Sequence, residues 1–257
     1  MGIIYDNTCM SLHTLRARDN IRTQPDDCII NKPFSSIDNT TLTEITYKCI
    51  VLGRDGWTIC PFWKPAVKEH LYNTWYKLSM LKMGDQIKKY FLEQDWNLLT
   101  QVVEFSLNEI HRPDMLFEAY ELFKNKFYTS CAMLLTAILE KCIYECTIET
   151  WRRQVIGPIN YRIVDYLQGA NKEDKELSRE SIVTFLLITS VDAFINTYFN
   201  INTDFENSAE PLNLERAWLM HGQSTRTVND VDCIKLLNAI CSFNYLLYIL
   251  LHNQYRD

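Results

Sequence analysis

The stretch SCAMLLTAILEKCIYECTI, residues Ser130–Ile148, is the clearest indication of the fold in this sequence. Its apolar residues recur every three or four positions, so they fall on one side of an α-helix. They are Leu134, Leu135, Ile138, Leu139, Cys142, Ile143 and Cys146. A stripe of this kind is buried against other helices, and we therefore expect the segment to belong to a helical bundle.

Helical periodicity continues on both sides of this segment. Upstream, the spacing predicts two helices between Ala66 and Phe105, separated near Gly84, and a third over Met115–Lys126. Downstream, the predicted helices are Ile182–Phe199, capped by Ser178, a short helix from Pro211 to Gly222, and Val231–His252. Other segments are expected to be irregular: Thr43–Leu52 is a short mixed segment, residues 53–56 form a turn, and Trp57–Trp63 is a strand or an extended loop packed on the bundle.

Composition agrees with an all-α protein. Seven glycines and seven prolines in 257 residues are few, which disfavours folds with many tight turns, and 47% hydrophobic residues suffice for a sizeable core. We expect three regions. They are an irregular lead-in over residues 1–42, a mostly helical N-terminal region over 43–110, and a helical domain over 111–257.

Charge and cysteine content narrow the function classes. The formal net charge is −6, so no global basic field gathers nucleic acid, and any nucleic-acid site must be local. The nine cysteines are odd in number and several lie at apolar helical positions, as buried free thiols of a reducing compartment do.

The N-terminus lacks the apolar core of a signal peptide, and Leu236–Leu251 is too short and polar for a membrane span. We expect a cytoplasmic protein with no membrane association.

The segment Leu214–Gly222, sequence LERAWLMHG, is the strongest candidate for chemistry. Arginine carries a permanent forked charge that suits phosphate oxygens, and histidine has the side-chain pKa nearest neutrality. Arg216 and His221 are five positions apart, so on a regular helix they differ by roughly 140° and do not face one phosphate. Either Gly222 ends the helix beside His221, or two chains each supply part of the site.

These residue types suit metal-independent cleavage of RNA. His221 would accept the proton of a 2′-hydroxyl or donate one to the departing 5′-oxygen, while Arg216 holds charge on the phosphate, giving a 2′,3′-cyclic phosphate. Arg226 would add a phosphate contact from a flexible loop, and Gln223 or Ser224 would hydrogen-bond the RNA backbone. The sequence has no Gly-rich phosphate loop, no Gly-x-Ser-x-Gly, no His-Glu-x-x-His and no Cys-x-x-Cys, so we expect no cofactor and no metal.

Leu214–Gly222, followed after a gap by the leucine-rich Asp232–Asn238, resembles the HEPN superfamily, in particular its abortive-infection-like branch. The family motif is Arg, four to six residues, then His. This resemblance implies a bundle of four or five helices over residues 111–257, a homodimer in which two motifs face a shared cleft, and endoribonuclease activity in phage defence or toxin systems. It also implies RNA as a partner, a possible antitoxin or defence-system partner, and an acidic residue on an earlier core helix, for which Glu140 is the match.

Two other interpretations stay open. Glu215 stands where the branch often has Asn before the arginine, and Ala217 replaces the polar residue common after it. This loss, with the acidic net charge, favours a non-catalytic module that binds RNA or protein. In the third interpretation the chain is a structural or regulatory bundle, with Arg216 paired to an acidic neighbour inside one subunit and His221 buried. Asp192 and Asn196, four apart, would line the cleft or form a satisfied polar pair.

Overall fold

The computed structural model describes residues 39–62, 87–92, 97–110, 112–147, 179–199 and 203–253. These residues form helices, turns and loops without any strand, so the predicted all-α class is confirmed. Besides a short helical stretch at 87–92, the helices are α2 (Asn39–Arg54), α5 (Asn97–Glu109), α6 (Pro113–Lys124), α7 (Tyr128–Thr147), α9 (Arg179–Tyr198), α10 (Arg216–Met220) and α11 (Asp230–Asn253).

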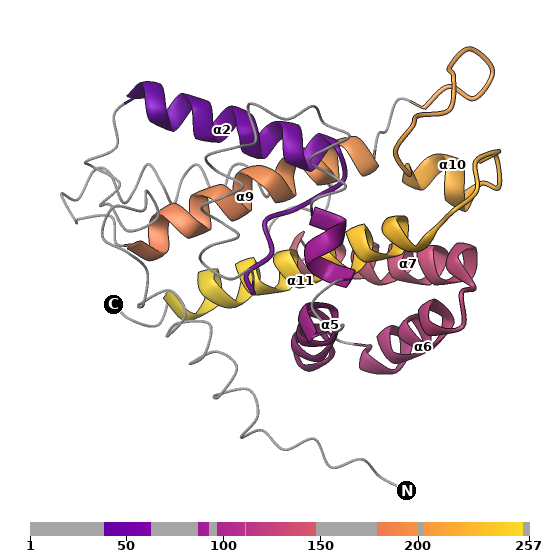
Figure 1. Ribbon diagram of the computed structural model, residues 1–257, viewed down its shortest axis with the longest axis horizontal. Coiled ribbons are helices and arrows are strands. Elements are labelled where there is room, and N and C mark those ends of the chain that lie inside the picture. Colours follow the sequence, from indigo (N-terminus) through magenta and orange to yellow (C-terminus); the bar gives the residue numbers. More distant parts are fainter. Residues whose placement is uncertain are drawn as a thin grey trace, which may run out of the picture.

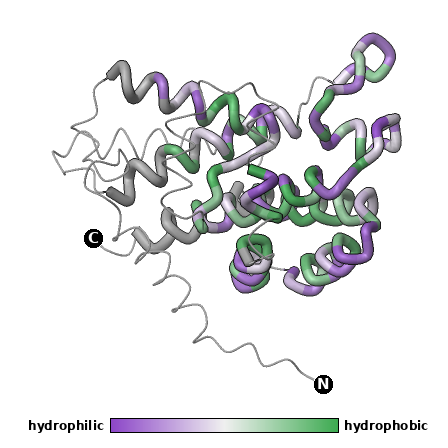
Figure 2. The backbone as a smooth tube through the Cα atoms, viewed as in Figure 1, coloured by the Kyte–Doolittle hydropathy of each residue, from purple (hydrophilic) through white to green (hydrophobic). Residues whose placement is uncertain are grey.

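Helix α11 lies at the centre of the bundle and packs against α7, α5 and α9 (Figure 1). Helix α2 lies along α9 on one side of it, and α6 packs against α7 on the other. Figure 2 shows the hydrophobic residues concentrated on α7 and α11 where the helices meet. The buried side chains form one continuous core, which runs from Cys49 on α2 to Leu246 on α11.

An extended segment, residues 57–60, is enclosed between α9 and α11. Its backbone would lose water contacts there, and three buried side chains replace them: Asn238 donates to the Thr58 carbonyl at 2.8 Å, Ser242 donates to the Ile59 carbonyl at 2.9 Å, and Ser190 accepts from the Ile59 amide at 3.0 Å. The expectation of an extended loop packed on the bundle is confirmed, and the strand alternative is not realised.

Helix α2 corrects two sequence expectations. The segment Thr43–Leu52 is helical instead of mixed, and its helix begins at Asn39, inside the predicted lead-in. The physical reason is contact with α9, which buries Cys49 and Leu52 and brings Gly53 against the Ser190 carbonyl. Only the second half of the predicted turn at 53–56 lies outside the helix, and Gly56 adopts a positive φ of 89° there.

The helix predicted from Pro211 starts later than expected. Its first residue is Arg216, because Glu215 before it is extended, with φ −125° and ψ 139°, and is buried where Thr203 donates to its carboxylate. The other predicted helices agree with α5, α6, α7, α9 and α11 within a few residues. The helix predicted after Gly84 is described over residues 87–92 and from Asn97 on, and residues 93–96 lie outside the described part of the chain. The helix expected from Ala66 towards Gly84 and the cap at Ser178 fall outside the described residues.

The described cysteines Cys49, Cys60, Cys131, Cys142, Cys233 and Cys241 are all buried free thiols, as predicted. Burial raises the pKa of the Cys49 and Cys241 thiols well above the usual range, so both stay protonated and inert. Within the described residues, no helix combines the length and apolarity needed to cross a membrane.

Candidate functional site

Helix α10 holds the two motif residues at its opposite ends. Arg216 is its first residue, and His221 is the residue that ends it. The end is a Schellman turn, in which the Gln223 amide binds the Trp218 carbonyl at 3.0 Å and the Gly222 amide binds the Leu219 carbonyl at 3.2 Å. Gly222 supplies the required positive φ, 67°, so the expectation that it terminates the helix beside His221 is confirmed.

The His221 imidazole is exposed on this turn. Its ring meets the edge of Phe205, with 5.7 Å between the ring centres, and Phe205 in turn meets Trp218 at 5.1 Å. The backbone amide of His221 donates to the Ala217 carbonyl at 3.1 Å, so the end of the helix is well ordered. The imidazole is therefore accessible to a ligand while its position is restricted by an aromatic neighbour.

Arg216 pairs with Glu140 of α7 inside the chain. Its Nε donates to Oε1 of Glu140 at 2.6 Å, and both side chains are about a third exposed, at 36% and 35%. Glu140 was expected only as an acidic residue on an earlier core helix, or as part of a solvated face, and its direct contact with the motif arginine was not predicted. The structural-bundle interpretation required a paired Arg216 together with a buried His221, and only the first of these is observed.

A buried hydroxyl pair lies beneath this ion pair. Thr136, one turn before Glu140 on α7, hydrogen-bonds the phenol of Tyr198 on α9. Burial raises the pKa of Tyr198 well above the usual range, with a smaller contribution from the nearby Glu140 carboxylate. Sequence reasoning missed both residues. The available signal was Thr136, a polar residue beside the apolar stripe of α7.

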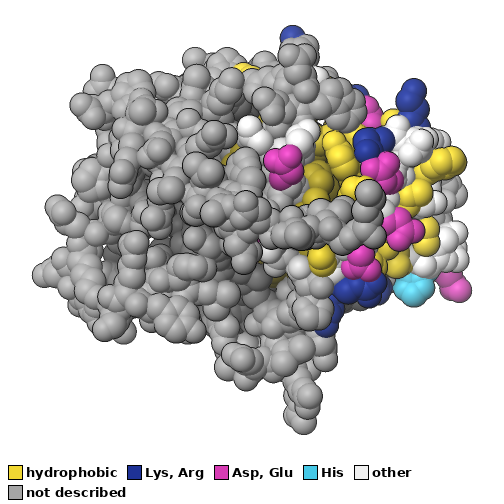
Figure 3. All heavy atoms as spheres, turned by 90° about the horizontal axis from the view of Figure 1, so that it is seen from below, with side chains coloured by type: hydrophobic (Ala, Val, Ile, Leu, Met, Phe, Trp, Pro, Cys, Tyr) yellow, Lys and Arg dark blue, Asp and Glu magenta, His cyan; other side chains and the backbone are white. Residues whose placement is uncertain are grey.

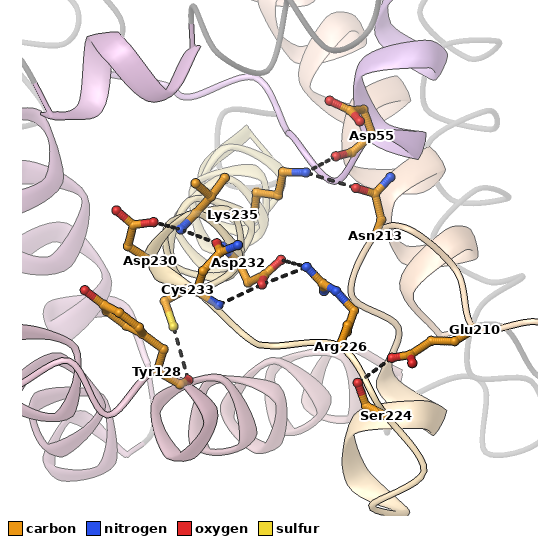
Figure 4. A network of polar contacts seen from close by, with 12 residues as sticks. Asp55, Tyr128, Glu210, Asn213, Ser224, Arg226, Asp230, Asp232, Cys233 and Lys235 are labelled. Carbon is orange, nitrogen blue, oxygen red and sulfur yellow. Dashed lines mark hydrogen bonds and ion pairs between the residues drawn. The ribbon is translucent and has the colours of Figure 1, made fainter.

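The loop between α10 and α11 is anchored by two acidic side chains. Glu210 accepts hydrogen bonds from the Ser224 hydroxyl and from the amide and hydroxyl of Thr225, the last two at 2.8 and 2.7 Å (Figure 4). Burial acts to raise the pKa of Glu210, but these donors outweigh it and hold the pKa below its usual value. Ser224 is therefore engaged inside the chain, whereas Gln223 is exposed beside it.

Arg226 is bound to the start of α11. Its Nη2 lies 3.0 Å from each carboxylate oxygen of Asp232, which also accepts from the Asn229 amide at 3.0 Å (Figure 4). The Arg226 side chain is 22% exposed and that of Asp232 only 5%. Arg226 thus projects from a loop that its ion pair with Asp232 ties to the start of α11. Asp232 was not among the predicted site residues, although an acidic residue in the first turn of a helix is a common partner for such a loop.

The polar network continues from α11 to the end of α2. Lys235 donates to the Asp55 carbonyl and to Oδ1 of Asn213, the latter at 3.1 Å (Figure 4). Its ammonium also lies 5.5 Å from the centre of the Trp57 ring. Burial lowers the pKa of Lys235 and raises that of Asp55. This part of the network fixes the loop before α10 to the core.

An open pocket of about 480 Å³ lies between α7 and the α10–α11 connection. Its lining comes from Thr129 and Met133 on α7, from Leu219 and Met220 on α10 and, from the connection, His221, Gly222, Ser224, Arg226 and Val228. The sequence candidates His221, Ser224 and Arg226 are brought together here. Arg216, Glu140 and Gln223 do not line it. The pocket thus joins one imidazole, one guanidinium and apolar side chains, an arrangement suited to a phosphate that carries an organic group.

Figure 3 shows acidic and basic side chains interspersed around hydrophobic ones on the described part of one face. Because both signs of charge are interspersed there, an anionic ligand on this part of the face would depend on individual arginine or lysine side chains and not on a broad positive patch. Among the described residues, no cluster of three or more His, Cys, Asp or Glu side chains is arranged to hold a metal ion. Asp192 and Asn196 bind one another at 2.9 Å, as a polar pair on α9.

Comparison with known proteins adds no relative from which a function could be inferred, so the functional argument depends on the geometry described above. The likeness to the HEPN motif rests on a short stretch around Arg216 and His221. No protein-family model, curated protein or solved structure matches the chain.

Proposed function

We propose that this protein is a metal-independent endoribonuclease of the HEPN type, acting in phage defence or as a toxin. The observation that carries the proposal is the position of His221. Its imidazole is exposed, ends a helix at a glycine turn, and lines a pocket that also contains a guanidinium. One sequence expectation supports it further: Gly222 ends α10 beside the histidine.

The reaction requires few parts. The 2′-oxygen of a ribose forms a bond to the adjacent phosphorus, and the bond from phosphorus to the 5′-oxygen breaks. His221 removes the proton from the 2′-hydroxyl, and the departing 5′-oxygen gains a proton from the same imidazole or from water. A guanidinium beside the phosphate stabilises the charge that develops on its oxygens. The products are a 2′,3′-cyclic phosphate and a 5′-hydroxyl.

In one chain the two motif residues do not share the pocket, since Arg216 is held by Glu140 outside it. A homodimer would bring the Arg216 of one chain towards the His221 pocket of the other, where it would contact the RNA backbone next to the phosphate that reacts, and we include this assembly in the proposal. The ionic contact of Arg216 with Glu140 is about a third exposed, so it costs little to rearrange when a phosphate competes for the guanidinium.

Incubation with mixed single-stranded RNA in EDTA tests the proposal. Wild-type protein should produce fragments with cyclic-phosphate ends, and His221→Ala should produce none. The matched control is Arg112→Gln, which removes an exposed arginine paired with Asp114 at the start of α6, away from the pocket lining. Arg112→Gln should cleave as the wild type does. Equal cleavage by wild type and His221→Ala, or none by either, removes the enzymatic proposal.

The second candidate is a non-catalytic module that binds RNA. The observation that favours it is the commitment of Arg216 to Glu140, which leaves the motif arginine neutralised in the chain. The net charge of −6 agrees, because a binder with this charge depends on local contacts. Salt-dependent binding of RNA without cyclic-phosphate ends in the same assay would identify this function.

A further inference from the structure

Two arginines lie near the candidate histidine, and their surroundings differ. Arg216 lies outside the His221 pocket, with its Nε bound to Glu140 at 2.6 Å. Arg226 lines the pocket together with His221. The family resemblance pairs His221 with Arg216, whereas the pocket of a single chain pairs it with Arg226.

The contacts of Arg226 leave one nitrogen of its guanidinium without a hydrogen-bond partner among the described residues. Asp232 occupies Nη2 alone, through both carboxylate oxygens at 3.0 Å. Nη1 is buried and has no hydrogen-bond partner among the residues that the structure describes. A buried N–H group without a partner costs free energy, and a ligand oxygen that reaches Nη1 when the side chain shifts towards the pocket recovers it. The Asp232 contact also fixes the direction of the guanidinium, so little side-chain freedom is lost when a ligand arrives.

We propose that Arg226, and not Arg216, holds the phosphate group on which His221 of the same chain acts. The inference rests on the proposed function and deepens it by assigning the phosphate-binding residue. The ligand class is a phosphate ester with an organic group. The apolar lining from Met133, Met220 and Val228 offers contact to a nucleoside, and the pocket volume of about 480 Å³ lies within the range that nucleotide-sized ligands occupy.

Asp232 acts as a positioning residue in this arrangement. Its carboxylate is 5% exposed and receives donors from Arg226 and from the Asn229 amide, so it is directed away from solvent. Glu210 holds the other side of the loop through Ser224 and Thr225. Together they fix Arg226 relative to His221, whose turn immediately precedes the loop.

The test uses a nucleoside 3′-monophosphate, with inorganic phosphate as a second probe, and follows the His221 ring signals by NMR. His221→Gln identifies the signals. The nucleotide should shift them in the wild type more strongly than inorganic phosphate at equal concentration. Arg226→Gln should weaken nucleotide binding by at least about tenfold, the loss of one charge-assisted hydrogen bond. Arg226→Lys should lie between, and the matched variant Arg112→Gln, at an exposed arginine away from the pocket lining, should bind within about threefold of wild type.

A second measurement uses wild-type protein alone, so it remains valid if the Arg226 side chain is required for folding. The Nε–H signals of the arginines are followed in wild-type protein during the same titration, and Arg226 should shift while Arg216 does not. The proposal is overturned if Arg216 responds and Arg226 does not, or if the nucleotide leaves the His221 signals unchanged. If Arg216 responds and Arg226 does not, but the protein still cleaves RNA, the proposal for Arg226 is wrong and the nuclease function is retained. Nucleotide binding that depends on Arg226 without any RNA cleavage supports the pocket and rejects the nuclease.

Discussion

The substitution Gly53→Ala tests whether helix propensity or the contact between α2 and α9 has the larger effect on stability at this position. Gly53 lies in the last turn of α2, where alanine is the better helix former by about 1 kcal/mol. Helix propensity alone therefore predicts a gain. In the bundle, however, a Cβ at this position would lie 2.4 Å from the Ser190 carbonyl oxygen, 2.7 Å from the Ala193 Cβ and 2.9 Å from the Phe194 amide nitrogen.

None of these three atoms is able to move aside independently, because two belong to the backbone of α9 and the third is attached directly to it. To restore an ordinary contact, α2 has to retreat by roughly 1 Å, and a gap of that size forfeits a quarter to a half of the dispersion energy along the contact. Overpacking of this kind costs about 3 kcal/mol, at the upper end of the usual range, because the contact is with backbone. Subtracting the propensity gain of about 1 kcal/mol leaves a net loss of about 2 kcal/mol.

Urea unfolding followed by circular dichroism measures this loss, which corresponds to a fall of roughly 4–8 °C in Tm for a chain of this size. The matched control is Ala137→Gly, a half-buried position on α7, which should lose about 1 kcal/mol through helix propensity. Both substitutions are expected to destabilise the protein, although helix propensity alone predicts a gain for Gly53→Ala and a loss for Ala137→Gly. A Gly53→Ala variant as stable as the wild type, with an unchanged m-value, would show that the contact between α2 and α9 does not limit stability.

Three further outcomes test other contacts. Asn238→Leu should lower the free energy of unfolding by about 1–3 kcal/mol, because the buried Thr58 carbonyl loses its donor; a loss below about 0.5 kcal/mol in urea would contradict the role of the extended segment. Glu210→Gln should be less stable than wild type above pH 4.5, the ordinary pKa of the group, because the folded pKa is lowered. That difference should vanish as the pH falls through the folded pKa, so a gap that stays constant into acid in pH-dependent urea curves would refute the assignment. Glu140→Gln should change stability by no more than about 1 kcal/mol, since the pair with Arg216 is a third exposed; a loss above about 2 kcal/mol by the same assay would mean that the pair is structural.

Part of the candidate site followed from the sequence. The end of α10 at Gly222 was predictable, because a glycine accepts the left-handed conformation that closes a helix, and that conformation is a local property. Glu140 followed from the family resemblance. The anchoring of Arg226 was missed, although Asp232 is only six residues away, since nothing in the spacing indicates which way the loop folds back.

The sequence by itself determined the all-α class, the α7 and α11 helices and the burial of the described cysteines. These depend on periodicity and hydrophobicity, which act between residues close in the chain. Only the tertiary structure decided that residues 39–54 are helical, that residues 57–60 run extended through the core, and that Arg216 lies outside the His221 pocket. The contacts responsible join distant residues, such as Thr58 with Ser242, 184 positions apart, and Arg216 with Glu140, 76 apart. Such pairs are fixed by the packing of whole helices, because burial of their apolar faces outweighs the preference of any short segment.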